Sequence, residues 1–322
     1  MQLLQSTRDS NAIDIDKIKE KATYIAKSMS RIPSEEEAVK IKKVVDESER
    51  LVVTYIGTYL PKIACFQFYY ILRTIGFKIS IATPEEVAYY IAPYTGVWSG
   101  QISTLIFADK PSSMIIRVTD SVKLSGNKVA LISATSLPPL IASKVEDVRL
   151  VTLDNNLQLP VFATIAAATI ALKPSTSNGV SNRLKRVIEE AKTIGEVAAE
   201  VVEKYSTKIV RVLRQVETVI IAYSPTLYPA VELISEMNLK NYRRNLVLVP
   251  LSQATQLVEE NWIETSSQLL LVHTGVEDDI VREVKFKASM HNISVEQIRI
   301  NTDPLTAQLY FTIAVLALTG VR

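Results

Sequence analysis

The chain repeats one pattern of apolar and polar positions about half its length apart. Residues 52–81 open with an apolar β-branched run, pass through a short turn, continue with apolar residues at helix spacing and end in a second apolar run. Residues 219–248 follow the same order and align with the first copy without a gap. A buried strand, a turn and an amphipathic helix make half of a βαβ unit. The two copies predict two similar α/β subdomains, with ligands at the carboxyl ends of their strands.

Apolar runs and helix-spaced stretches alternate along the rest of the chain. Strands are expected at residues 51–56, 78–82, 103–107, 128–133 and 147–152, and again at 218–222, 245–249, 268–273 and 294–300. Helices are expected at 12–49 with a split at Pro33, and at 60–75, 112–125, 160–172, 181–216 and 305–318. Residues 251–261 are expected to form a loop. This alternation predicts an α/β fold of two three-layer αβα subdomains with mainly parallel sheets.

Turn-forming residues divide the chain near its middle. Residues 173–179 (KPSTSNG) contain no apolar side chain and form the strongest candidate linker. We therefore expect an N-terminal helical arm at 1–50 and a first subdomain at 51–174. A linker with a second helical arm is expected at 175–216, followed by a second subdomain at 217–322.

Composition and charge narrow the class of protein. The chain has 322 residues, is 48% hydrophobic and 22% charged, and carries a net charge of +2, which is typical of packed domains without a nucleic-acid-binding or membrane-binding surface. The longest apolar stretches, 161–172 and 309–318, are too short to cross a bilayer. No signal-peptide pattern opens the chain. A cytoplasmic protein that binds neither nucleic acid nor membrane is expected.

The scarcity of cysteine and histidine limits the available chemistry. Cys65 is the only cysteine and lies in the apolar run IACFQFYYI, so we expect a buried structural thiol and no disulfide. His273 and His291 are the only histidines, which argues against a multi-histidine metal centre. No G-x-G-x-x-G motif follows a strand, which argues against a dinucleotide-binding fold. Neither a metal nor a cofactor is expected.

The segments follow the order helical arm, subdomain, linker, helical arm and second subdomain. This order resembles that of the double sugar isomerase (SIS) family, including the isomerase half of glucosamine-6-phosphate synthase. The similarity runs from about residue 15 to residue 322. Gly57-Thr58-Tyr59 stands where that family has Gly-Thr-Ser, and residues 128–136 (KVALISATS) resemble its strand that runs into a hydroxyl-rich turn. The resemblance implies SIS-type subdomains, a phosphorylated sugar or amino sugar as small-molecule ligand, and a homodimer.

The loop after the third strand departs from the family pattern. The family's Ser-x-Ser-Gly-x-Thr loop holds a sugar phosphate with hydroxyls and backbone N–H groups, whereas residues 108–113 read ADKPSS. Pro111 lacks an N–H and cannot adopt glycine conformations; Asp109 would repel a phosphate and Lys110 would attract one. Alternatively, this segment is a capped helix start, with Pro111 in the first turn and Ser112 or Ser113 as the cap. The candidate ligand-binding residues are Gly57, Thr58, Tyr59, Lys110, Ser112, Ser113, Thr135 and Ser136.

Candidate groups for proton transfer lie in the second half of the chain. Aldose–ketose isomerisation needs a base next to the carbonyl carbon, and the family supplies a glutamate and a loop histidine. This chain has Asn241 near the glutamate position and no histidine within 251–261. Glu232 and Glu236, one helical turn apart, and His273, at a strand end, are the candidate catalytic residues. The alternatives are exposed helix carboxylates and a strand-end histidine whose hydrogen bonds are satisfied.

The sequence therefore leaves two functions open. The first is a diverged sugar-phosphate isomerase or aminosugar-handling enzyme, with its pocket between the subdomains or across a dimer interface. The second is a non-catalytic SIS-type protein that senses a sugar derivative or works as an assembly partner. The changed phosphate loop, the missing glutamate and the missing loop histidine favour the second function.

Overall fold

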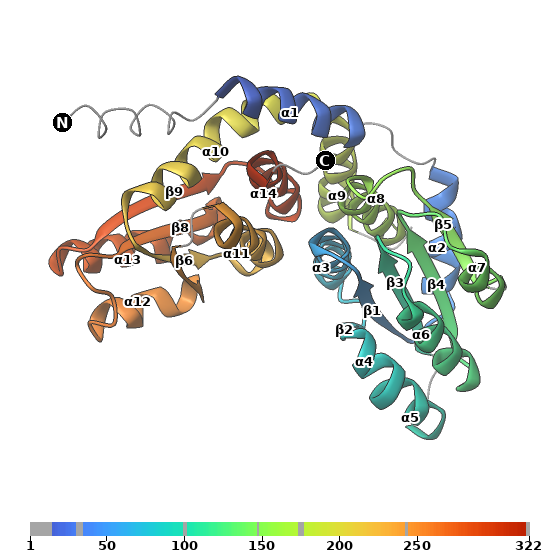
Figure 1. Ribbon diagram of the computed structural model, residues 1–322. Helices are drawn as coiled ribbons and strands as arrows, with labels where there is room; N and C mark the ends of the chain where they lie inside the picture. Colours follow the sequence, from blue (N-terminus) through green and yellow to red (C-terminus); the bar gives the residue numbers. More distant parts are fainter. Residues whose placement is uncertain are drawn as a thin grey trace.

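The computed structural model describes residues 15–29, 35–98, 102–146, 148–172, 177–241 and 244–319. Figure 1 shows two α/β units side by side, with helices between their sheets and with α1 lying across the top. All strand pairs in both sheets are parallel. The predicted α/β class with parallel sheets is therefore confirmed.

Sheet A has the strand order β2-β1-β3-β4-β5. Helices α2, α3 and α8 pack on its inner face, and α4 to α7 with the π-helical turn η2 pack on its outer face. The strands are β1 (Arg50–Ile56), β2 (Ile79–Ile81), β3 (Ile102–Ala108), β4 (Lys128–Ser133) and β5 (Arg149–Thr152). The helices are α2 (Glu35–Asp46), α3 (Tyr59–Thr74), α4 (Pro84–Glu86), η2 (Val87–Ile91), α5 (Ala92–Trp98), α6 (Ser113–Leu124), α7 (Pro139–Lys144) and α8 (Gln158–Ala171).

Sheet B has the strand order β7-β6-β8-β9. Helices α10, α11 and α14 cover its inner face, and α12 and α13 cover its outer face. The strands are β6 (Thr218–Tyr223), β7 (Asn245–Pro250), β8 (Gln268–Thr274) and β9 (Ser294–Ile300). The helices are α10 (Ala198–Gln215), η3 (Pro225–Leu227), α11 (Tyr228–Asn241), α12 (Leu251–Glu259), η4 (Gly275–Glu277), α13 (Asp278–Met290) and α14 (Pro304–Thr319).

One hydrophobic core joins the inner faces of the two sheets. It contains side chains from β1 and β3 as well as from β6 and β8, with α3, α8, α11 and α14 between them. Every residue of β3 and β8 is buried, as expected for central parallel strands covered on both faces. The buried Cys65 belongs to this core, and burial raises the pKa of its thiol, so the predicted structural role fits its position.

Two fully buried glutamines tie the units together within this core. The Gln308 side-chain amide on α14 donates to the Ile63 carbonyl on α3 at 3.1 Å, and the Gln67 side-chain amide on α3 donates to the Leu305 carbonyl on α14. A buried amide is stabilising only when it is hydrogen-bonded. The reciprocal pair therefore fixes the register of α3 against α14, and with it the position of one unit relative to the other.

The helical arms pack across the two units. α1 (Ile15–Met29) lies against α10 and α14 of the second unit, whereas α9 (Asn178–Thr193) lies against α8 of the first (Figure 1). The expected helical region at 181–216 consists of two helices, because turns at 194–197 separate α9 from α10 and Gly195 lies within them. Asn178 and Gly179 belong to α9 and not to a linker; residues 173–176 and the expected split at Pro33 lie outside the described residues.

Two further local expectations need correction, and one short helix is additional. Residues 251–259 form α12 and not a loop, because Leu251, Ala254 and Val258 recur at helix spacing and are buried against the sheet. The short helix α7 was not expected. Pro111 lies before the N-cap of α6 and not in its first turn.

Candidate functional site

The carboxyl ends of β1 and β3 lie next to each other at the point where the strand order of sheet A reverses. Ile56 pairs with Ala108, and the Asp109 amide donates to the Ile56 carbonyl at 3.3 Å. Such reversal points form the crevice in which open parallel sheets bind ligands. The predicted loops after β1, β3 and β4 therefore share one edge, since the Ala134 amide also donates to the Ala108 carbonyl at 2.8 Å.

The Asp109 carboxylate lies at this reversal point. Its Oδ1 accepts a hydrogen bond from the Thr58 amide at 3.0 Å, and its Oδ2 accepts one from the Thr58 hydroxyl. Thr58 is the N-cap of α3 and makes no side-chain cap of its own, so Asp109 occupies the place where a helix N-terminus would hold an anion. A Cβ on Gly57, which has a φ of +126°, would lie 1.8 Å from Asp109 Oδ1.

Sheet B repeats this arrangement at its own reversal point between β6 and β8. The Ser224 hydroxyl, directly after β6, donates to Glu277 Oε1 at 2.7 Å. Glu277 Oε2 accepts from the Thr274 amide at 2.9 Å and from the Thr274 hydroxyl at 2.6 Å. Each sheet thus has a carboxylate from the loop after its third strand bridging to a hydroxyl from the loop after its first strand.

The other candidate ligand residues of sheet A do not gather around one point. Ser112 caps α6 by accepting from the Met114 amide at 3.2 Å, which is the capping alternative. The Thr135 carbonyl accepts a hydrogen bond from the hydroxyl of Ser133, two residues earlier, at 2.8 Å. Tyr59 is half-buried at the start of α3. The remaining three, Lys110, Ser113 and Ser136, are exposed at the same sheet edge.

Glu232 contacts the first unit through an ion pair with Lys62. We call this pair, together with Tyr55, Tyr223 and Tyr228, the Lys62–Glu232 cluster. Lys62 on α3 donates to Glu232 Oε2 on α11, and the two side chains are 16% and 25% exposed. The Tyr228 hydroxyl donates to Glu232 Oε1 at 3.2 Å. Both oxygens of Glu232 are therefore engaged, at a position between the units that water still reaches.

Tyrosine rings surround the Lys62 ammonium. Its Nζ lies 5.1 Å from the centre of the Tyr228 ring and 5.8 Å from that of Tyr55, within the range of cation–π attraction. The Tyr223 and Tyr228 rings are 5.2 Å apart. Burial raises the pKa of Tyr55, Tyr223 and Tyr228, so their hydroxyls stay protonated and can donate at neutral pH. Tyr55 is the penultimate residue of β1 and Tyr223 is the last residue of β6, near the strand ends where ligands were predicted.

The structure does not bring the other two catalytic candidates to this cluster. Glu236 is half-buried one turn further along α11. His273 is buried, and strand alternation places it on the face of β8 that packs against α12 and α13, opposite the cluster. Its Nδ1–H donates to the Thr274 carbonyl at 2.7 Å, its Nε2 is buried without a partner, and burial lowers its pKa, so the ring is neutral.

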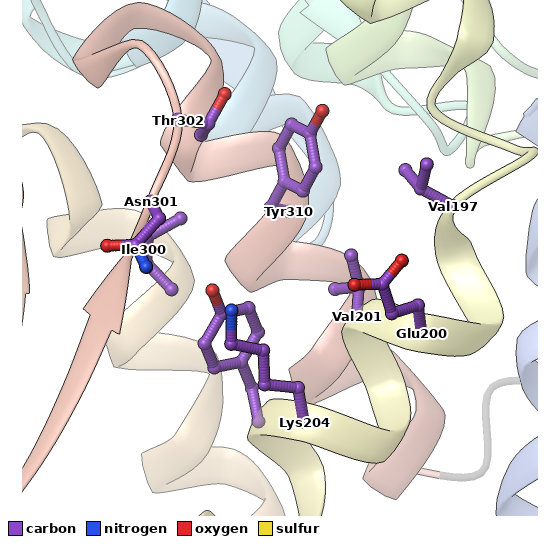
Figure 2. A pocket seen from close by; sticks show the side chains of 9 residues that line it. Val197, Glu200, Val201, Lys204, Ile300, Asn301, Thr302 and Tyr310 are labelled. Carbon is purple, nitrogen blue, oxygen red and sulfur yellow. The ribbon is translucent and has the colours of Figure 1, made fainter.

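A small hollow of about 180 Å³ lies at the carboxyl end of β9. Figure 2 shows Glu200 and Lys204 reaching into it from α10, Tyr310 lining it from α14, and Asn301 and Thr302 after the strand. Burial raises the pKa of Tyr310, so its hydroxyl is neutral. This hollow combines an apolar floor with a few polar groups, which is the usual make-up of a small-molecule site.

The described ranges contain neither a metal-binding group of side chains nor a membrane-spanning helix. No group of three or more histidine, cysteine or acidic side chains among those residues could hold a metal ion. Across the same ranges, no helix combines the length and the apolar character needed to span a bilayer.

Sequence reasoning did not identify Lys62, Tyr55 or Tyr223 as members of one cluster, and it treated Asp109 as a charge that would repel a phosphate without pairing it with Thr58. The available signals were an aromatic hydroxyl near the end of an apolar strand and a lone lysine one turn after Thr58 in an apolar helix. Neither signal shows that α3 and α11 face each other. That proximity arises only from packing.

The whole fold is similar to that of solved phosphosugar-handling proteins. The C-terminal domain of glucosamine-fructose-6-phosphate aminotransferase from Francisella tularensis matches with a TM-score of 0.64 at 13% identity, over 97% of this chain and 96% of that chain. Tagatose-6-phosphate ketose/aldose isomerase from Escherichia coli matches with a TM-score of 0.63 at 9% identity, over 94% and 91%. Glucosamine-6-phosphate deaminase from Thermotoga maritima matches with a TM-score of 0.62 at 8% identity, over 94% and 92%.

At these identities the similarity shows the fold alone. No protein-family model matches the sequence, and no curated protein matches it either. The expected resemblance to sugar isomerases therefore holds for the architecture, and the ligand has to be inferred from this chain's own residues.

Proposed function

We propose that this protein binds an amino sugar at the Lys62–Glu232 cluster and does not isomerise phosphosugars. The observation that supports this proposal is the Asp109 carboxylate at the N-terminus of α3. A carboxylate in an anion-binding position excludes a phosphate by both volume and charge. The similar solved structures are named for phosphorylated sugars, so the proposal departs from them at this residue.

The local charge favours a cationic ligand. Thr58, which holds Asp109, precedes Lys62 by four residues, so helix spacing places them on neighbouring turns of one face of α3. Glu232 is paired with Lys62, whereas the Asp109 carboxylate forms no ion pair among the described residues and is held by Thr58. The ammonium of an amino sugar would balance the remaining charge. The sugar ring would lie against the tyrosines, whose protonated hydroxyls can donate to its oxygens.

A thermal-shift and calorimetric panel tests this function. Glucosamine is expected to raise the melting temperature by mass action, with about 2.7 kcal/mol of added stability at a concentration of about 100 times its Kd. Glucose, fructose 6-phosphate and inorganic phosphate are expected to give little or no shift. A shift with fructose 6-phosphate and none with glucosamine would contradict the proposal, and a flat panel would favour the assembly-partner alternative.

Two variants locate the site if glucosamine binds. Glu232→Gln keeps the size of the side chain but removes its charge, and we expect it to weaken glucosamine binding about tenfold, since a charge-assisted hydrogen bond is lost. Glu200→Gln changes the hollow beside β9 in the same way and serves as the matched control. If Glu200→Gln loses glucosamine binding while Glu232→Gln keeps it, the ligand binds in that hollow and not at the cluster.

Isomerisation is the second candidate function, and Glu232 is the observation that favours it. A carboxylate at the carboxyl ends of facing strands could take a proton from a bound sugar. Both of its oxygens are engaged by Lys62 and Tyr228, however, and no histidine stands beside it. We expect no turnover of fructose 6-phosphate at an enzyme-like rate. Such turnover, if lost in Glu232→Gln or Glu236→Gln, would establish the isomerase instead.

The homodimer remains a prediction that rests on the resemblance to sugar isomerases. The apolar stripes of the arms do not require a second chain, because residues such as Ile25, Met29, Leu184 and Val187 are buried in this chain's own core. We expect light scattering to give about twice the chain mass of 35.8 kDa. A mass of one chain at micromolar concentration would overturn the prediction.

A further inference from the structure

A second cavity system opens at the opposite end of sheet A from Gly57 and Asp109. Two hollows of about 440 Å³ and about 370 Å³ share Arg50, Lys78 and Ser80 among their lining residues. Arg50 is the first residue of β1, and the Leu51 amide donates to the Lys78 carbonyl at 2.9 Å, so the two basic residues lie side by side at the amino ends of β1 and β2. We call this region the basic hollow.

The basic hollow carries an excess of positive charge that the protein does not balance. The smaller hollow is also lined by Arg73, from the last turn of α3. Among the residues that the structure describes, none forms an ion pair or a side-chain hydrogen bond with Arg50, Arg73 or Lys78, and the one acid in the lining is Glu49. Unpaired cations around a concave surface concentrate positive potential there and attract anions.

Aromatic rings flank the larger hollow. Tyr90 and Tyr94, which also line it, are 73% and 58% exposed and stand four residues apart, on one face of the helix formed by η2 and α5. Two large aromatic rings are thus exposed to solvent at the mouth of a cavity. The floor of this cavity, which includes Val52 and Ile102, is apolar. Exposed tyrosines beside a cavity commonly serve recognition, because the ring is apolar and the hydroxyl is polar.

The backbone that carries these tyrosines is unusual and firmly held. η2 is a five-residue π-helical turn, a rare conformation that is found disproportionately at functional sites. The Ser121 hydroxyl on α6 donates to the Ala88 carbonyl of this turn at 2.7 Å, and the hydroxyl of Ser125, the C-cap of α6, donates to the carbonyl of Ala92, directly after the turn, at 2.5 Å. Side-chain hydrogen bonds from α6 and its C-cap thus hold the π turn, which carries Tyr90, and the start of α5, which carries Tyr94.

We propose that the basic hollow binds a nucleoside diphosphate, with its phosphates on the three basic side chains and its base against the tyrosine rings. Guanidinium groups match phosphate oxygens in a two-pronged geometry, and a lysine adds a point charge. Each base stacked on an aromatic ring contributes about 1–3 kcal/mol. The combined cavity lies in the size range of small-molecule sites. The chain has no glycine-rich phosphate loop, so phosphate recognition here belongs to side chains.

Isothermal titration with ADP tests the proposal. ADP is expected to bind, more weakly as salt is raised, because the phosphate contacts are partly exposed. Arg50→Gln with Lys78→Gln is expected to reduce the affinity at least about tenfold, since two charge-assisted contacts are lost. Lys144→Gln, an exposed lysine on α7, is the matched control and should leave the affinity unchanged. Because all of these side chains are exposed, unchanged circular dichroism is expected for every variant.

Two comparisons separate the phosphate contribution from that of the base. Tyr94→Leu with Tyr90→Leu is expected to weaken ADP binding about fivefold or more, while leaving the weaker binding of pyrophosphate unchanged. The proposal is overturned if ADP gives no binding at millimolar concentration, if the double basic variant binds ADP as tightly as the parent, or if the tyrosine variant does. Tighter binding of a short RNA strand than of ADP would overturn it in favour of nucleic acid. Glucosamine binding should be unaffected by all of these variants, so the two proposals fail independently.

Discussion

Asp109→Ser is expected to create a phosphate site that the parent protein lacks. Removing the carboxylate frees the Thr58 amide and hydroxyl and leaves the N-terminus of α3 without an anion. A helix N-terminus with free N–H groups and a neighbouring hydroxyl binds phosphate readily. We expect inorganic phosphate or fructose 6-phosphate, at a saturating concentration, to stabilise the variant by about 1–3 kcal/mol more than they stabilise the parent. Denaturant unfolding with and without phosphate measures the difference.

Asp109→Asn is the matched control for this experiment. It keeps the volume of the side chain and one hydrogen-bond acceptor but removes the charge, so the crevice stays occupied. A phosphate response in the serine variant alone indicates that volume excludes the anion, whereas a response in both variants indicates that charge does. If neither variant responds to phosphate, the crevice is not a latent anion site, and the main support for an unphosphorylated ligand is lost.

Gly57→Ala is expected to be the most destabilising single-methyl change at the candidate site. The new Cβ would meet Asp109 Oδ1 at 1.8 Å, and the φ of +126° is one that side chains rarely adopt. Backbone strain and the loss of the carboxylate that caps α3 together predict a decrease of about 3 kcal/mol in the free energy of unfolding. Chemical denaturation followed by circular dichroism gives this value directly.

Gly126→Ala separates the two causes. Gly126 also has a positive φ, of +74°, but no atom lies within 4 Å of a Cβ built there. We expect it to cost about 1–2 kcal/mol from backbone strain alone. Combining Gly57→Ala with Asp109→Ser should recover part of the larger loss, because the clash is removed while the strain stays. Equal losses for Gly57→Ala and Gly126→Ala would show that the carboxylate moves aside without cost.

The resemblance between the two halves extends further than the sequence suggests. Asp109 and Glu277 are different residues in loops of different sequence, yet each bridges from the end of the third strand of its sheet to a hydroxyl at the end of the first. Both crevices are therefore closed by the protein's own carboxylates. A gapless alignment of strand and helix could not show this, because the bridge depends on which strands are neighbours.

The sequence by itself determined the elements and their class. Apolar strands alternating with helix-spaced segments are sufficient to predict α/β architecture, since burial on both faces requires runs such as those of β3 and β8. The pattern also located the carboxyl strand ends where Thr58, Asp109 and Ser112 lie. It failed at 251–259, where helix spacing was taken for a loop, and it did not show the break at Gly195 within the expected helical region.

Only the tertiary structure decided which of these residues meet. Lys62 and Glu232 are 170 positions apart, and Asp109 and Thr58 are 51 apart, so no local pattern could pair them. Their contacts follow from a shared core that presses α3 against α11 and α14, and from a strand order that places β3 beside β1. Hydrophobic burial is non-directional and specifies that helices must pack, whereas the particular partners are chosen by shape and by buried hydrogen bonds such as those of Gln67 and Gln308.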